Sequence, residues 1–230
     1  MLAYLVRHAE SLTNAQLSES MNPPLSHLGL CQTEALVRGL SGIQFTAIYS
    51  SPFRRCLDTA EPIARSRSLP IRVRPELHEC YYLPAGTRID TELEPMSEIL
   101  ATRPIASLCE DWFGPIVLPA VDETREQLFA RMLSFGDYLK QRWGDTDEAV
   151  LVVSHGSPIA KLIDSWLSDV PGPSYRFAID NATVSVLRYR AGVGTLVCLN
   201  ERSHLRDLPP PEVANYDERG AIKPRMPTLR

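Results

Sequence analysis

The chain lacks several features that define common protein classes: it has few cysteines, no long apolar run and no excess of positive charge. Its five cysteines include no C-x-x-C pair, which argues against a disulfide framework or a structural zinc site and favours reduced thiols. No apolar stretch approaches the roughly 20 residues of a membrane span, and Arg7 interrupts the apolar N-terminus too early for a signal peptide. These absences predict a soluble, cytoplasmic protein that does not associate with membranes.

The charge of the chain excludes further partners. With 28 acidic and 24 basic residues, the formal net charge is −4, so we expect no broad basic surface for nucleic acid. The basic residues are 21 Arg and 3 Lys. Arg suits bidentate phosphate binding, but only the placement of individual arginines is informative. The chain has no glycine-rich nucleotide loop and no H-x-H or H-E-x-x-H pattern, so we expect no cofactor and no metal.

Short apolar segments alternate with amphipathic segments along the chain. Helices are predicted from Ser26 to about Gly39 or Gly42, from Pro52 to about Arg65, and over 123–143 and 158–167. Strands are predicted over 2–6, 45–49, 71–73, 149–153, 183–189 and 195–199, the last two joined by an Ala-Gly-Val-Gly turn. This alternation is typical of an α/β domain, and we predict a three-layer αβα sandwich with a mostly parallel central sheet.

Basic side chains follow three of the predicted strands at the point where each strand ends. Arg7 and His8 follow the first strand, Arg54 and Arg55 the second, and His155 the fourth. Because ligands bind outside the carboxyl ends of the strands in an open parallel sheet, we expect these groups to share one edge. Two imidazoles with guanidinium groups suit a phosphoryl group, which one His attacks while the cations offset the charge on its oxygens.

Such a site needs further properties. The attacking nitrogen must be unprotonated, and the leaving oxygen needs a proton, usually from a carboxylic acid with a raised pKa. Gly156 permits close backbone approach at the start of a helix, where free N–H groups bind anions. At this stage either Arg54 or Arg55 could be a surface residue, and the acid is not identified.

The order and spacing of these residues resemble the histidine phosphatase superfamily, which is phosphoglycerate-mutase-like in fold. The segment LVRHAES with Asn14 is similar to R-H-G-x-[ST]-x-x-N. Further matches are Pro24-Leu25-Ser26 with Gly29 and Gln32, Ser50-Ser51-Pro52 with Arg55 and Thr59-Ala60, Leu77-His78-Glu79, Val153-Ser154-His155-Gly156, Asn181, and Asn200 with His204-Leu205. Together they extend over about residues 4 to 205 and favour the phosphatase branch.

The resemblance implies a role for each matching residue. His8 would be phosphorylated, and Arg7 and Arg55 would bind the phosphoryl oxygens. His155 would donate to the phosphate and stabilise the transition state, Asn14 would face the phosphate pocket, and Gly156 would contribute to substrate binding. The pattern selects Arg55 over its neighbour, which leaves Arg54 facing solvent or at the rim.

The general acid implied by the resemblance is Glu79. After it the chain reads CYYLPAGTRIDTELEP, whereas many family members continue with glycine and a W-E-G-type segment. Four other carboxylates therefore remain alternatives: Glu76, Asp90, Glu92 and Glu94.

Residues 80–119 are rich in proline and acidic side chains, which predicts an insertion with short helices over the active site. After His204 the chain contains three consecutive prolines and a polar run, typical of a surface or disordered tail. We therefore predict one domain over 1–205 and a Pro-rich tail over 206–230.

Other side chains have structural interpretations. We expect a surface position for His27, a strand-face role for His78, an N-cap at Asp122 or Thr124, and a small buried thiol at Cys56. Packing of the insertion onto the core is the favoured role for most of the aromatic residues Tyr81, Tyr82, Trp112 and Phe113.

The predicted function is hydrolysis of a small phosphorylated metabolite through a phosphohistidine intermediate, with a homodimer possible. A phosphoglycerate mutase is the first alternative, but residues 80–119 carry only Arg88 and Arg103 as cations beside six acidic residues. A second is a domain that binds a phosphorylated ligand without turnover. A metal hydrolase is the third, and the proposed cations would repel a metal.

Overall fold

A seven-stranded sheet forms the middle layer of the described part of the protein, in the order β4-β3-β2-β5-β1-β6-β7. The computed structural model describes residues 1–80, 96–111, 123–168 and 176–208. The strands are β1 (Leu2–Arg7), β2 (Ala47–Ser50), β3 (Ile71–Val73), β4 (Ala106–Leu108), β5 (Ala149–Ser154), β6 (Val184–Arg190) and β7 (Val193–Glu201). Neighbours from β4 to β1 pair in parallel, whereas β6 pairs antiparallel with both β1 and β7.

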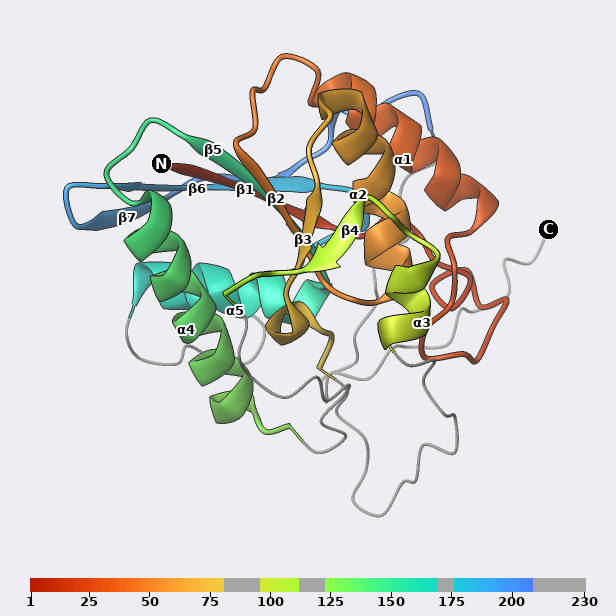
Figure 1. Cartoon of the computed structure of the whole chain (residues 1–230), viewed down its shortest axis with the longest axis horizontal. Coiled ribbons are helices and arrows are strands. Elements are labelled where there is room, and N and C mark those ends of the chain that lie inside the picture. The colour runs from red at the N-terminus through yellow and green to blue at the C-terminus, as the bar shows by residue number, and fades with distance from the viewer. Residues whose placement is uncertain (81–95, 112–122, 169–175, 209–230) are drawn as a thin grey trace.

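Helices cover both faces of this sheet (Figure 1). One face carries α1 (His27–Gly39) and α2 (Arg54–Arg67), and the other carries α4 (Arg125–Trp143) and α5 (Gly156–Leu167). The short helix α3 (Met96–Ala101) precedes β4, and two 3₁₀ turns are η1 (Pro75–Leu77) and η2 (Ser203–Leu205). The predicted three-layer architecture with a mostly parallel sheet is confirmed.

The alternation of side chains along β1 divides the core into two clusters. Leu5 packs toward α4 and α5 with Leu128 and Phe135, while Val6 packs toward α1 and α2 with Leu36. Successive side chains of a strand point to opposite faces, so a central strand buried on both faces is apolar at nearly every position.

The register of the central strands brings their carboxyl ends to one level. Arg7 of β1 lies opposite Ser154 of β5, and Ser50 of β2 lies opposite Val153. His8, Ser51 and His155 therefore leave the sheet at the same edge, as the sequence predicted.

Local signals fix where the helices begin. Ser26 caps α1 by accepting the Gly29 N–H at 3.0 Å, and Thr124 forms a capping box with Gln127 at the start of α4. Three predicted starts differ from the structure by two residues: α2 begins at Arg54 rather than Pro52, α4 at Arg125 rather than Glu123, and α5 at Gly156 rather than Pro158.

Two further predictions need correction. Strand β4 lies within the stretch predicted as an insertion and pairs in parallel with β3. The hairpin between β6 and β7 turns on Ala191 and Gly192 alone, both with positive φ. Val193 and Gly194, predicted as part of the turn, already belong to β7.

The tail from residue 209 and the aromatic residues Tyr81, Tyr82, Trp112 and Phe113 lie outside the described residues. None of the described helices combines the length and hydropathy required to span a bilayer.

Candidate active site

His8 lies at the end of β1 with a defined tautomer. Its backbone N–H continues the ladder to the Ser154 carbonyl at 2.9 Å, and its side chain is almost fully buried. The ring Nδ1 lies 2.8 Å from the carbonyl oxygen of Ala9. Because a carbonyl only accepts, Nδ1 carries the proton and Nε2 of the neutral ring holds a free lone pair.

That lone pair faces Arg55 in the first turn of α2. The Arg55 Nε–H donates to His8 Nε2 at 3.2 Å, and its Nη1 donates to the Met21 carbonyl at 2.9 Å. Burial, with the charges of Arg55 and Arg7, holds the pKa of His8 well below its ordinary value of 6.5. His8 is thus kept in the unprotonated form that a nucleophile requires.

Arg7 supplies a buried cation beside the imidazole. Its Nη1 donates to the Ile179 carbonyl at 2.6 Å, whereas its buried Nε has no hydrogen-bond partner among the described residues. Gly156 lies against this guanidinium, since a Cβ added there would be 3.7 Å from Arg7 Cζ. An unsatisfied buried guanidinium N–H next to a helix N-terminus is a donor set suited to an anion.

His155 is the N-cap residue of α5 and is fully buried. Its ring centroid lies 5.1 Å from that of His8, and its Nε2 is 2.8 Å from the Ser51 hydroxyl. The Cys56 thiol lies 3.4 Å from the same nitrogen and is buried as predicted. Burial, followed by the charge of Arg55, lowers the pKa of His155 well below 6.5, so the ring is neutral.

Glu79 reaches His155 from the turn that follows η1. Its Oε2 lies 3.9 Å from His155 Nδ1, and its Oε1 accepts the Cys80 N–H at 2.9 Å. The side chain is 18% exposed. Burial raises the pKa of Glu79, although Arg55 and Arg7 oppose the effect. A carboxyl group that retains its proton more easily than usual therefore stands beside His155.

The remaining candidate acids are placed differently. Glu76 forms a buried ion pair with Arg74, which also binds Asp111 at 2.8 Å. Asp90, Glu92 and Glu94 lie outside the described residues.

Asn14 joins the active-site region through its acceptor oxygen. Oδ1 accepts the Ser11 hydroxyl at 2.9 Å and the Asn181 Nδ2 at 3.3 Å. The same Asn181 amide donates to the His8 carbonyl at 2.9 Å. These contacts turn the acceptor oxygen away from an anion, and the Nδ2 group of Asn14 is the part of the amide that can donate to a bound phosphoryl group.

Several residues that matched the family pattern without an assigned role hold the segment after β1. Thr59 accepts the Ala9 N–H at 3.0 Å, and Gln32 accepts the Glu10 N–H at 2.8 Å. Ser26 donates to the Glu10 carboxylate at 2.6 Å. The only sequence signal for these roles was the spacing of the motifs, because each contact joins residues far apart in the chain.

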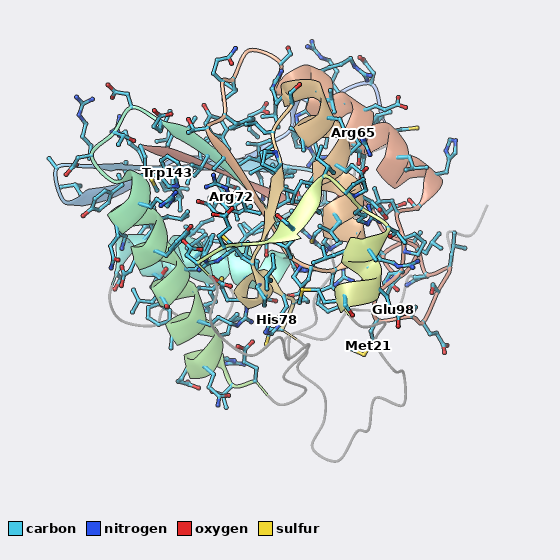
Figure 2. The ribbon with its side chains drawn as sticks, in the orientation of Figure 1. Met21, Arg65, Arg72, His78, Glu98 and Trp143 are labelled. Carbon is cyan, nitrogen blue, oxygen red and sulfur yellow. The ribbon has the colours of Figure 1, made fainter. Side chains whose placement is uncertain are left out.

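The sequence predicts structural positions for two other histidines, His27 and His78. His27 is exposed, as predicted. His78 was predicted on a strand face, but it is buried in the turn after η1 and donates from Nδ1 to the Glu79 carbonyl at 2.8 Å. Figure 2 shows His78 just beyond the carboxyl end of β3. Burial and the nearby Arg131 lower the pKa of His78 to about 4. Arg54, the neighbour of Arg55, is half-buried.

The described residues contain no group of three or more Asp, Glu, His or Cys side chains placed to hold a metal ion.

A mostly parallel α/β sheet whose carboxyl edge carries two neutral imidazoles and two buried guanidiniums, with a carboxyl group beside them, is the arrangement of a phosphoryl-transfer enzyme. Comparison with known proteins agrees: the model of the histidine phosphatase superfamily (branch 1) matches residues 3–202. The chain belongs to this superfamily, as its motifs predicted.

Relatives with phosphatase names cover nearly the whole chain. Adenosylcobalamin/alpha-ribazole phosphatase of Escherichia coli (strain K12) is 26% identical over 210 residues, which is 88% of this chain and 97% of the relative. Phosphoserine phosphatase 1 of Hydrogenobacter thermophilus is 27% identical and covers 87% of this chain and 92% of its own length. The alpha-ribazole phosphatase structure from Shigella flexneri has the same fold, with a TM-score of 0.65, 24% identity, and coverage of 88% of this chain and 97% of that one.

Proposed function

We propose that this protein hydrolyses a small phosphorylated metabolite through a phosphohistidine formed on His8. The observation that carries the proposal is the His8 tautomer: a neutral, buried ring whose Nε2 lone pair points at Arg55. Nucleophilic catalysis by histidine needs this unprotonated nitrogen, and cations around it suit the charge of a phosphoryl group.

In the first step the phosphoryl group binds between the two arginines. Arg7 Nε, the Arg55 guanidinium and the N–H groups that begin α5 at Gly156 donate to its oxygens, with His155 and the Asn14 amide as further donors. His8 Nε2 forms a bond to phosphorus as the bond from phosphorus to the ester oxygen breaks. Glu79 transfers its proton to the departing alkoxide, so that a neutral alcohol leaves.

In the second step water replaces the alcohol. The Glu79 carboxylate takes a proton from the water as its oxygen attacks phosphorus, and the bond from phosphorus to His8 Nε2 breaks. Inorganic phosphate leaves, and both His8 and Glu79 return to their starting protonation states. The same carboxyl group thus serves as acid and then as base, as microscopic reversibility allows.

The cations available in the structure favour hydrolysis over mutase chemistry. Arg103, one of the two arginines in the stretch 80–119, is bound by Asp58 and Glu61 of α2. It is therefore committed to an ion-pair network instead of a second phosphate subsite.

The names of the relatives, alpha-ribazole phosphatase and phosphoserine phosphatase, support a small metabolite as substrate. No two cysteines of the described residues are joined by a disulfide, which supports a role in the cytoplasm.

The decisive experiment measures phosphate release from a panel of phosphorylated metabolites by wild type and His8→Ala. We expect His8→Ala to lose activity by more than about 10⁴-fold on the best substrate, while the exposed His27→Ala retains it. Wild type should also trap substrate phosphate on His8, as a label that acid releases and base does not. Turnover by His8→Ala would refute the proposal, and isomerisation of phosphoglycerate faster than phosphate release would replace it with a mutase.

A further inference from the structure

The turn that carries Glu79 is held by side chains from two other elements. Its own backbone hydrogen bonds run from Leu77 N–H to the Arg74 carbonyl at 3.0 Å and from His78 N–H to the Pro75 carbonyl at 3.1 Å. The next three carbonyls, those of residues 76, 77 and 78, belong to the last two residues of this short 3₁₀ turn and to the residue that follows it. Carbonyls at the end of a helical turn need donors from elsewhere when they are buried.

Arg131 of α4 supplies two of these donors. Its Nη1 donates to the carbonyls of both Glu76 and His78, the latter at 3.1 Å. The other side of its guanidinium is fixed by Glu123, whose carboxylate accepts from Nε at 2.7 Å and also from Nη2. The Glu123 carboxylate is almost fully buried, so this bidentate pair is a rigid support.

Ser154 supplies the third donor. Its hydroxyl donates to the Leu77 carbonyl at 2.7 Å. Ser154 is the last residue of β5 and directly precedes His155. One hydrogen bond therefore ties the turn that bears the carboxyl group to the strand that bears the imidazole.

We infer that Arg131 and Ser154 are positioning residues that hold the Glu79 carboxyl group in place for proton transfer to the leaving oxygen. The inference rests on the proposed role of Glu79 as the acid. Three consecutive carbonyls bound by two side chains fix the path of the backbone up to Glu79 itself. Proton transfer requires heavy atoms within about 3 Å, so a turn that shifts by even 1 Å loses most of its contribution.

Leaving-group dependence separates positioning of an acid from a general structural role. An alkyl phosphate needs a proton on its leaving oxygen, whereas an aryl phosphate with a good leaving group needs it little. We expect Arg131→Lys, which keeps the charge but loses the bidentate geometry, and Ser154→Ala to lower kcat/KM on the alkyl ester by about tenfold or more. On the aryl ester each should lower kcat/KM less than about twofold, because kcat/KM does not contain the later hydrolysis of phosphohistidine, in which Glu79 acts on both substrates alike. The exposed Arg125→Lys on the same helix is the matched control.

A double-mutant cycle with Glu79→Gln completes the test. If both residues act through Glu79, their effects on the alkyl ester should largely disappear in the Glu79→Gln background. Equal losses on the two esters, or undiminished losses in that background, would overturn the inference while leaving Glu79 as the acid. Should Glu79→Gln itself slow both esters equally, the acid role proposed for Glu79 would fail first. If Arg131→Lys does not fold, Ser154→Ala alone decides the outcome.

Discussion

The Nε–H of Arg55 lies 3.2 Å from His8 Nε2, the nitrogen that we propose attacks phosphorus. In the free protein the arginine therefore occupies the position that the phosphoryl group must take. Substrate binding has to turn this N–H from the imidazole to a phosphoryl oxygen, which frees the lone pair when the electrophile arrives. Arg55 thus has two roles. Before binding it helps to lower the pKa of His8, and after binding it offsets the negative charge of the phosphoryl group.

The first prediction concerns the acid side of the pH profile. A protonated Nε2 cannot attack, so kcat/KM falls as pH drops through the pKa of His8. Arg55 helps to lower that pKa, and Arg55→Gln should therefore move the acidic limb to higher pH, toward 6.5. At the optimum we expect a loss of about 10²–10³-fold, typical of removing one charge-stabilising donor. Arg54→Gln is the neighbouring control, and an unmoved acidic limb in Arg55→Gln would contradict the assignment.

A second prediction concerns the basic side of the profile. The acid must be protonated in the first step, so kcat/KM on alkyl phosphates should fall as pH rises through the pKa of Glu79. Burial raises this pKa above its ordinary value of 4.5, so the basic limb should lie above that value. In Glu79→Gln the limb should vanish and the alkyl ester should slow by about 10²–10⁴-fold. If wild type shows no basic limb on alkyl esters, another group is the acid.

Glu79 should also cost stability, which gives a third prediction. A carboxyl group whose pKa is raised by folding binds protons more tightly in the native state, so its ionisation destabilises the fold as pH rises. The penalty is absent below the unfolded pKa and complete above the folded pKa. Glu79→Gln should therefore raise Tm at pH 8 and change it little near pH 4.5. Calorimetry at the two pH values measures the difference, and a lower Tm at pH 8 would contradict it.

The fourth prediction tests the packing that holds the His8 segment. A Cβ on Gly29 would lie only 2.0 Å from the carbonyl oxygen of Glu10, so α1 and the segment after β1 would have to separate. We expect Gly29→Ala to reduce the free energy of unfolding by about 1–3 kcal/mol. A Cβ on Gly42 would meet no atom within 4 Å. Gly42→Ala is therefore the matched control in urea unfolding. Similar midpoints for the two variants would show that α1 adjusts freely.

Much of the site could be predicted because its chemistry lies at the ends of apolar strands. Arg7, His8 and His155 follow runs of residues buried on both faces of the sheet, and parallel strands bring such ends together. Arg55 required the motif, since Arg54 has the same local setting. The motif was also needed to identify Glu79. This residue follows a short 3₁₀ turn instead of the end of a strand, and the chain there has no hydrophobic periodicity.

The features that could not be predicted from the sequence depend on contacts between residues far apart in the chain. Strand β4 is three residues long and, among the described strands, pairs with β3 alone, so no periodicity identifies it within a Pro-rich stretch. Arg131 lies in the helix predicted over 123–143, but nothing in the sequence indicates that it binds carbonyls some fifty residues earlier. Asn181 matched a motif, yet its contact with the His8 carbonyl spans most of the chain.

That last contact has a consequence for biosynthesis. Strand β1 leaves the ribosome long before both of its neighbours in the sheet, β5 and β6, which lie more than 140 residues later in the chain. The His8 carbonyl is bound by Asn181 and by the N–H of Ala182. Domains fold during synthesis from the N-terminus onward, yet here the nucleophile is translated before the strands that surround it. A nascent chain that ends before Ala149 therefore has its histidine but no enzyme around it, and catalysis can begin only after β5 and β6 have been translated.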